Sequence, residues 1–106
     1  MATFQQVLAI GTTPLKVLSF NLKRVAWRVT FLSSALAAGN TGRVHVGRNI
    51  APNTVVGDPN SGDAILQSSE VKEAKVFADD TIFLGDLWLT ASAANQQVSI
   101  EETTKD

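Results

Sequence analysis

The stretch Arg24-Val25-Ala26-Trp27-Arg28-Val29-Thr30-Phe31 decides the expected fold. Its large apolar residues recur at every second position, namely Val25, Trp27, Val29 and Phe31. On an extended chain the opposite face carries Arg24, Arg28 and Thr30. Such alternation is typical of a β-strand with one buried face. We therefore expect a strand that places Trp27 in the core and the two arginines in solvent.

A helical pattern competes with the strand in the same region. Apolar residues also recur at helical spacing, at Leu22, Val25, Val29, Leu32 and Leu36. Trp27 and Phe31 fall outside that stripe, and β-branched residues favour extended chain. The strand is therefore the preferred interpretation.

Similar short apolar runs lie on both sides of this strand. They span residues 4–10, 15–20, 43–47, 71–77, 81–84, 86–90 and 97–100. The segment 49–63 is different, because its prolines, glycines, Asn and Asp are turn formers that predict a long loop. Seven or eight short antiparallel strands predict an all-β fold, a single β-sandwich or barrel.

Chain length and composition indicate one domain. The 106 residues, which include no cysteine, have the usual size of a domain that is stable without disulfides or metal. We expect one β domain over residues 1–106 that ends in a polar tail, 101–106. Residues 1–12 have two interpretations: the first strand of the sandwich, or an extended arm that adds a strand to a neighbouring subunit.

The charge balance narrows the class of partner. Nine Lys and Arg face ten Asp and Glu, so the formal net charge is -1 and no strong field attracts phosphates or anionic lipid. We expect protein partners, with no nucleic acid and no membrane. The first residues lack the features of a secretory signal, and no apolar run has the length of a membrane span. We expect the protein to be made in soluble form in the cytoplasm.

Groups that could perform catalysis do not converge in the sequence. The single histidine, His45, alternates with two valines, so we expect it on the polar outer face of a sheet, away from any nucleophile. The adjacent acids at 79–80 and 101–102 point to opposite faces of an extended chain. Residues 58–63 resemble part of a calcium loop but lack its terminal glutamate. We expect no catalytic residue, cofactor or metal, and hence no enzyme.

Trp88 is the aromatic residue most suggestive of function. It alternates with Leu87 and Leu89, so either Trp88 or the two leucines must point away from the core. Apolar side chains on an outer face often mark an interface with another subunit. Combined with the first segment, this reasoning gives the interface candidates Phe4, Val7, Leu8, Ile10 and Trp88.

Three motifs follow one another in the carboxyl-terminal part of the chain. They are Asn40-Thr41-Gly42-Arg43-Val44-His45-Val46-Gly47, Asp86-Leu87-Trp88-Leu89-Thr90-Ala91 and Asn95-Gln96-Gln97-Val98-Ser99-Ile100. Together they resemble the pattern of small β-sandwich structural proteins of tailed-bacteriophage virions, over roughly residues 24–100. The motifs are strand and turn signatures and carry no catalytic group. The resemblance implies a capsid decoration or cement protein, a head-fibre base or a tail accessory.

Two functional hypotheses result. In the first, the protein is a virion structural protein that decorates or cements a phage capsid as a symmetric oligomer. We expect a trimer, bound to the major capsid protein or another virion protein at the virion surface, because three-fold positions are common in capsid lattices. In the alternative, the protein is a carbohydrate-binding β-sandwich module whose loops and a tryptophan contact host glycans.

Overall fold

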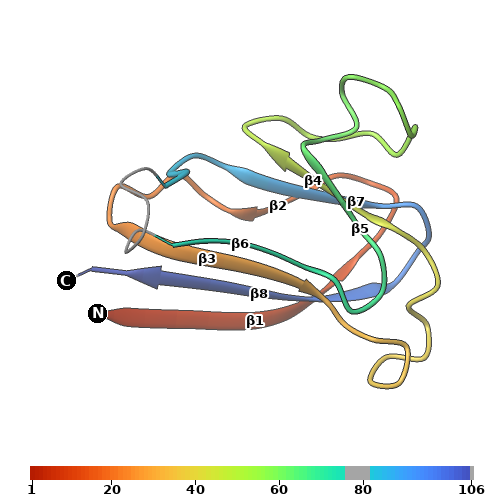
Figure 1. The fold of residues 1–106 in the computed structure, drawn as a ribbon, viewed down its shortest axis with the longest axis horizontal. Helices are drawn as coiled ribbons and strands as arrows, with labels where there is room; N and C mark the ends of the chain where they lie inside the picture. Colours follow the sequence, from red (N-terminus) through yellow and green to blue (C-terminus); the bar gives the residue numbers. More distant parts are fainter. Residues whose placement is uncertain (76–81, 106) are drawn as a thin grey trace.

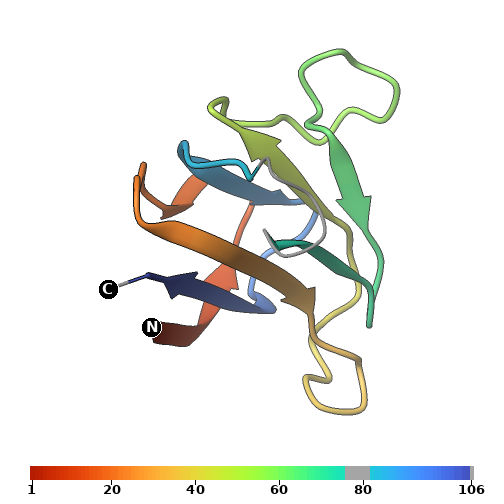
Figure 2. The ribbon, with the colours of Figure 1, turned by 60° about the vertical axis from the view of Figure 1, so that its left-hand side comes forward.

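The computed structural model describes residues 1–75 and 82–105, which form eight strands and no helix. The strands are β1 (Ala2–Ile10), β2 (Leu15–Leu18), β3 (Arg24–Phe31), β4 (Val44–Arg48), β5 (Ala64–Leu66), β6 (Val71–Lys75), β7 (Leu87–Ala91) and β8 (Gln96–Thr104). They form two four-stranded antiparallel sheets, ordered β1-β8-β3-β6 and β2-β7-β4-β5, that face each other (Figures 1 and 2). The predicted all-β sandwich is therefore confirmed.

The strand pairing is nested. The first strand pairs with the last, β2 with β7, β3 with β6 and β4 with β5, and every pair is antiparallel. The chain thus has the topology of one long antiparallel hairpin of four strand pairs. Pairing of β3 with β8 and of β4 with β7 brings these strand pairs together into two sheets. This arrangement of eight strands is a jelly roll.

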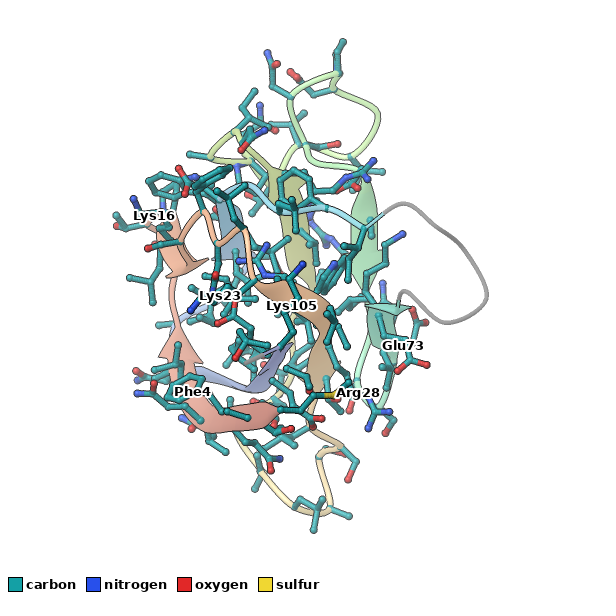
Figure 3. The ribbon with its side chains drawn as sticks, turned by 90° about the vertical axis from the view of Figure 1, so that its left-hand side faces the viewer. Phe4, Lys16, Lys23, Arg28, Glu73 and Lys105 are labelled. Carbon is teal, nitrogen blue, oxygen red and sulfur yellow. The ribbon has the colours of Figure 1, made fainter. Side chains whose placement is uncertain are left out.

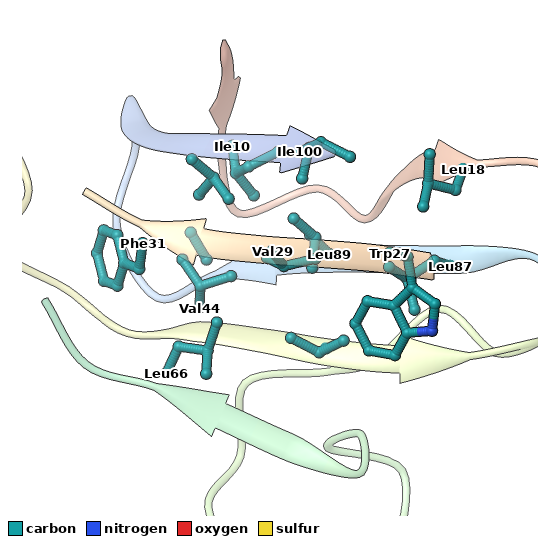
Figure 4. Packing of buried hydrophobic residues seen from close by; sticks show 13 residues of the cluster. Ile10, Leu18, Trp27, Val29, Phe31, Val44, Leu66, Leu87, Leu89 and Ile100 are labelled. Atoms are coloured by element: carbon teal, nitrogen blue, oxygen red, sulfur yellow. The ribbon is translucent and has the colours of Figure 1, made fainter. Parts of the chain in front are cut away.

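The core lies between the two sheets (Figure 4). It consists of apolar side chains that point inward from alternate strand positions: Ile10, Leu18, Trp27, Val29, Phe31, Val44, Val46, Leu66, Leu87, Leu89, Ala91, Val98 and Ile100. Trp27, Val29 and Phe31 are buried as their alternation predicts. The helical alternative for Leu22 to Leu36 is wrong, since β3 occupies the centre of that region.

The alternation fails at the start of β3. Arg24, expected in solvent, is only 2% exposed, because the pairing with β8 shifts register between Arg24 and Ala26. One residue of offset moves a side chain to the other face of a sheet. Val25, expected in the core, is only half-buried.

Both ends of the chain belong to the first sheet. Of the two interpretations of residues 1–12, the first-strand interpretation describes this structure, since β1 pairs with β8 from Ala2 to Ile10. The expected polar tail is wrong for residues 101–104, because β8 continues to Thr104. Strands on both sides, β1 and β3, supply the backbone hydrogen bonds that keep this polar segment extended.

The loops agree with the sequence except in two places. No strand interrupts residues 49–63, as expected, but the three-residue strand β5 directly after them was not predicted. Residues 82–84, expected in an apolar strand, lie in a loop whose Ile82 and Phe83 pack against the core. The remaining parts of two predicted runs, residues 76–77 and 81, lie outside the described residues.

Two buried amides fix the connection between β3 and β4. Asn40 donates to the carbonyls of Leu32 and Gln97, and its own side-chain oxygen accepts from the Gln97 N–H at 2.6 Å. The side-chain oxygen of Gln96 accepts from the N–H groups of Thr41 and Gly42. A segment with no strand pairing is thereby held in one conformation.

Candidate functional site

The loop 49–63 folds back over the outer face of the sheet β2-β7-β4-β5, while its tip projects beyond the sheet (Figure 1). The close approach of this loop to β4 requires glycine at two positions. A Cβ on Gly47 would clash with the carbonyl of Ile50, and one on Gly62, whose φ is +95°, would clash with the carbonyl of Val46. An ion pair between Arg48 and Asp63, at 2.6 Å, closes the end of the loop. Side chains beneath the loop are therefore buried although they point away from the core.

His45 is one of these side chains. The expectation that it lies on an exposed polar face is wrong, because it is completely buried. It does point away from the core, as its alternation with the valines requires, but the loop covers it. Its Nδ1 lies 2.9 Å from the carbonyl oxygen of Ser61. A carbonyl only accepts, so Nδ1 donates, and in the neutral imidazole Nε2 is left as an acceptor.

A cleft of about 240 Å³ lies between this loop and the turn that joins β1 to β2. Its lining residues are Thr12, Pro14, Ala51, Pro52, Asn53, Thr54 and Thr90. Thr90 comes from β7, and the other residues come from the two loop segments. The lining thus combines hydroxyl and amide groups with apolar proline rings, and none of its side chains is charged.

Buried polar atoms without a hydrogen-bond partner gather beside the cleft. Within the described residues there are four such side-chain atoms, and three belong to Arg43, His45 and Thr90: Arg43 Nε, His45 Nε2 and Thr90 Oγ1. His45 lies directly opposite Thr90 in the pairing of β4 with β7, and Arg43 donates to the carbonyl of Thr54 at 3.3 Å. A buried polar group without a partner costs about 1–3 kcal/mol. This cluster on one face of a sheet makes the cleft the candidate functional site.

Trp88 lies on the same outer face. Leu87 and Leu89 are fully buried, so the choice left open by the sequence is decided in favour of Trp88 pointing outward. Trp88 is half-buried, and the ammonium group of Lys16 lies 6.0 Å from the centre of its ring. Trp88 and Thr90 are two residues apart on β7, which places them about 7 Å apart along one face.

The other interface candidates lie on β1 and differ in exposure. Phe4 is 50% exposed and Val7 is 53% exposed. Leu8 is half-buried against the core, and Ile10 is fully buried. Ile10 is therefore a core residue and not available to a partner, whereas Phe4 and Val7 are.

Other groups considered from the sequence have local structural roles. In the segment resembling a calcium loop, Asp58 Oδ1 accepts from the N–H of Asn60, and Asp63 pairs with Arg48. Glu102, expected in the tail, pairs with Arg24 at 2.7 Å. The acids at 79–80 lie outside the described residues. In the part of the chain that is described, no three His, Asp or Glu side chains gather where they could hold a metal ion.

Sequence reasoning missed Arg43, His45 and Thr90 as a group. Alternation does place His45 on an outer face and puts Thr90 on the same face of its strand as Trp88, but nothing local indicates that a distant loop covers them. No known protein family matches this chain, and neither a curated protein nor a solved structure does. The described residues contain no helix that is long and apolar enough to cross a membrane.

Proposed function

We propose that this chain is a structural protein of a tailed-phage virion, which decorates or cements the capsid as a symmetric homo-oligomer. The observation that carries the proposal is the edge strand β1, whose outer side is unprotected. Two further features support it: the jelly-roll topology, which is widespread among viral capsid domains, and the phage-like motifs over roughly residues 24–100.

Natural proteins protect the edges of their sheets, because an open edge pairs with other chains. Three of the four edges here are protected. The strand β5 has only three residues, β2 has four residues with Lys16 beside a register shift, and β6 carries Lys72 and Glu73. Phe4 on β1 and Glu73 on β6 mark the opposite edges of one sheet (Figure 3).

The fourth edge, β1, has none of these protective features, which are a short strand, charged residues and a register shift. It is nine residues long, contains no charged residue, glycine or proline, and pairs with β8 without a register shift. Residues 2–7 are exposed even though they form a strand. A neighbouring chain can therefore add a strand along this edge and cover Phe4 and Val7.

Closed symmetry limits such an association to a defined oligomer. A trimer placed on a three-fold or quasi-three-fold position would make several weak contacts with the capsid at once, which raises the effective affinity. In this proposal the partners are further copies of the chain and the major capsid protein or another virion protein. The place of action is the virion surface.

The test is sedimentation of the full chain alone and with tailed-phage capsids that lack it. We expect an oligomer that co-sediments with the capsids. Val7→Lys places a charge on the open edge and should weaken self-association at least tenfold. Val71→Lys is the matched control, since Val71 is 49% exposed on the protected strand β6, and it should leave association unchanged. A chain that stays monomeric and does not bind capsids would refute the proposal.

A further inference from the structure

At the floor of the cleft between residues 12–14 and 51–54 lies a hydroxyl group that has no hydrogen-bond partner among the described residues of the protein. Thr90 is 2% exposed, lines the cleft, and its hydroxyl has no partner in the protein. His45 beside it has its Nδ1 proton engaged by Ser61, so Nε2 is free to accept. Thr90 therefore gives the floor a buried hydroxyl that can donate and accept, whereas the unused acceptor of His45 lies outside the lining of the cleft.

The walls indicate what kind of molecule fits. Thr12, Asn53 and Thr54 contribute polar groups, and Pro14 and Pro52 contribute apolar surface. No lining side chain carries a charge that would select an ion. At about 240 Å³ the cleft is smaller than the ~300–1,000 Å³ typical of sites for drug-sized ligands. A small neutral molecule with several hydroxyls and an apolar face matches these properties.

We infer that this cleft binds one neutral sugar unit, whose hydroxyl completes the hydrogen bonding of Thr90. Because the Thr90 hydroxyl is buried, the sugar reaches it by displacing the wall at 51–54. That wall is loop, and loops open at lower free-energy cost than paired strands. Trp88 lies about 7 Å from Thr90 along the same face of β7, outside the lining of the cleft.

An anion is the main competing ligand, because Arg43 lies behind the wall. Its guanidinium donates to the Thr54 carbonyl, however, and Arg43 is not among the residues that line the cleft. The neutral sugar is therefore favoured, and the anion becomes an outcome of the test. Sugar binding here is independent of assembly through β1, which lies on the other sheet.

The experiment is a titration of the isotope-labelled full chain, followed by amide NMR. The probes are glucose, galactose, mannose and N-acetylglucosamine, with acetate and inorganic phosphate as charged probes. We expect at least one sugar to bind with a Kd of about 1–10 mM, since a single unit makes few contacts. The largest shift changes should lie at the amides of the non-proline residues of the cleft, which are Thr12, Ala51, Asn53, Thr54 and Thr90.

Thr90→Val separates a binding role from a structural one. Valine has the shape of threonine without the hydroxyl, so the variant should bind the sugar about three- to tenfold more weakly. It should also be more stable, with a Tm higher by about 2–8 °C, because an unsatisfied buried hydroxyl is removed. Thr30→Val, on the outer face of the other sheet, is the control and should leave sugar binding unchanged.

Three results would overturn the inference. The first is the absence of shift changes at the cleft with every sugar. The second is an unchanged sugar affinity in Thr90→Val. The third is stronger binding of phosphate or acetate than of any sugar at the same residues, which would assign the cleft to an anion.

Discussion

Arg24 is buried and Arg43 is half-buried, and their hydrogen bonding differs. The guanidinium of Arg24 donates to Glu102 at 2.7 Å and to the carbonyls of Ser19, Phe83 and Gly85. Among the described residues, the guanidinium of Arg43 makes one long bond, 3.3 Å to the Thr54 carbonyl, and its Nε has no partner. In the sequence the two residues cannot be told apart, because each is a positive charge directly before an apolar strand position.

The difference separates a structural cluster from the site inferred to bind a ligand. Arg24 ties β3 to β8 and to two connecting loops, and the protein itself engages four of its five N–H donors, all at a residue that is only 2% exposed. Arg43 belongs with His45 and Thr90 to a group in which each side chain has a buried polar atom without a hydrogen-bond partner. Buried polar groups that are fully paired rigidify a fold, and those left unpaired are costly unless something else binds them.

The largest effect is expected from Arg24→Met. Loss of the guanidinium leaves Glu102 and three carbonyls without their partner in a region shielded from water, which should lower the free energy of unfolding by about 3–5 kcal/mol. Thermal or urea unfolding measures this loss. Arg28→Met is the control, because the Arg28–Glu73 pair is 41% exposed on both sides and should contribute at most about 0.5 kcal/mol. Equal losses in the two variants would contradict the structural role of Arg24.

An intermediate effect is expected from Gly62→Ala, which forces the loop 49–63 away from its sheet. A Cβ at residue 62 would meet the Val46 carbonyl at a positive φ, so we expect a loss of about 3 kcal/mol and new exposure of His45. Gly57→Ala has a similar φ of +88° but no atom within 4 Å, and should cost only about 1 kcal/mol. Unfolding curves and amide hydrogen exchange at His45 would measure both. If the two variants behaved alike, close packing of the loop on the sheet would be wrong.

The smallest effect is expected from Arg43→Met. One long hydrogen bond is lost while an unpartnered buried Nε is removed, so the free energy of unfolding should change by less than about 1 kcal/mol. The same unfolding measurement as for Arg24→Met makes the comparison direct. A loss that approaches that of Arg24→Met would show that Arg43 is structural and would remove the contrast between the two arginines.

Most of the strands could be predicted from the sequence, because two-residue alternation follows directly from the geometry of extended chain. β3, β4 and β8 are the clearest cases. The short strand β5 was missed, since three residues are too few to establish a period. The extension of β8 through residues 101–104 was missed as well, because its polar side chains gave no sign that strands lie on both sides.

The candidate site was far less predictable. Trp88 was identified, but the sequence left its direction open, and the burial of Leu87 and Leu89 decided it. Phe4 and Val7 were proposed as interface residues and are exposed on an edge strand, whereas Ile10 from the same segment is in the core. Alternation puts Val7 on the face of β1 opposite to Phe4 and Ile10, but it does not separate Phe4 from Ile10, because their exposure depends on how far the opposing sheet extends over them.

By itself, the sequence determined that this is a cysteine-free all-β protein with Trp27, Val29 and Phe31 in its core. The tertiary structure alone decided that Arg24 is buried, that β1 is an open edge, and that a loop covers His45 and Thr90. The physical reason is the same in each case. Periodicity reports which residues share a face of a strand, whereas burial depends on what segments distant in the sequence place over that face.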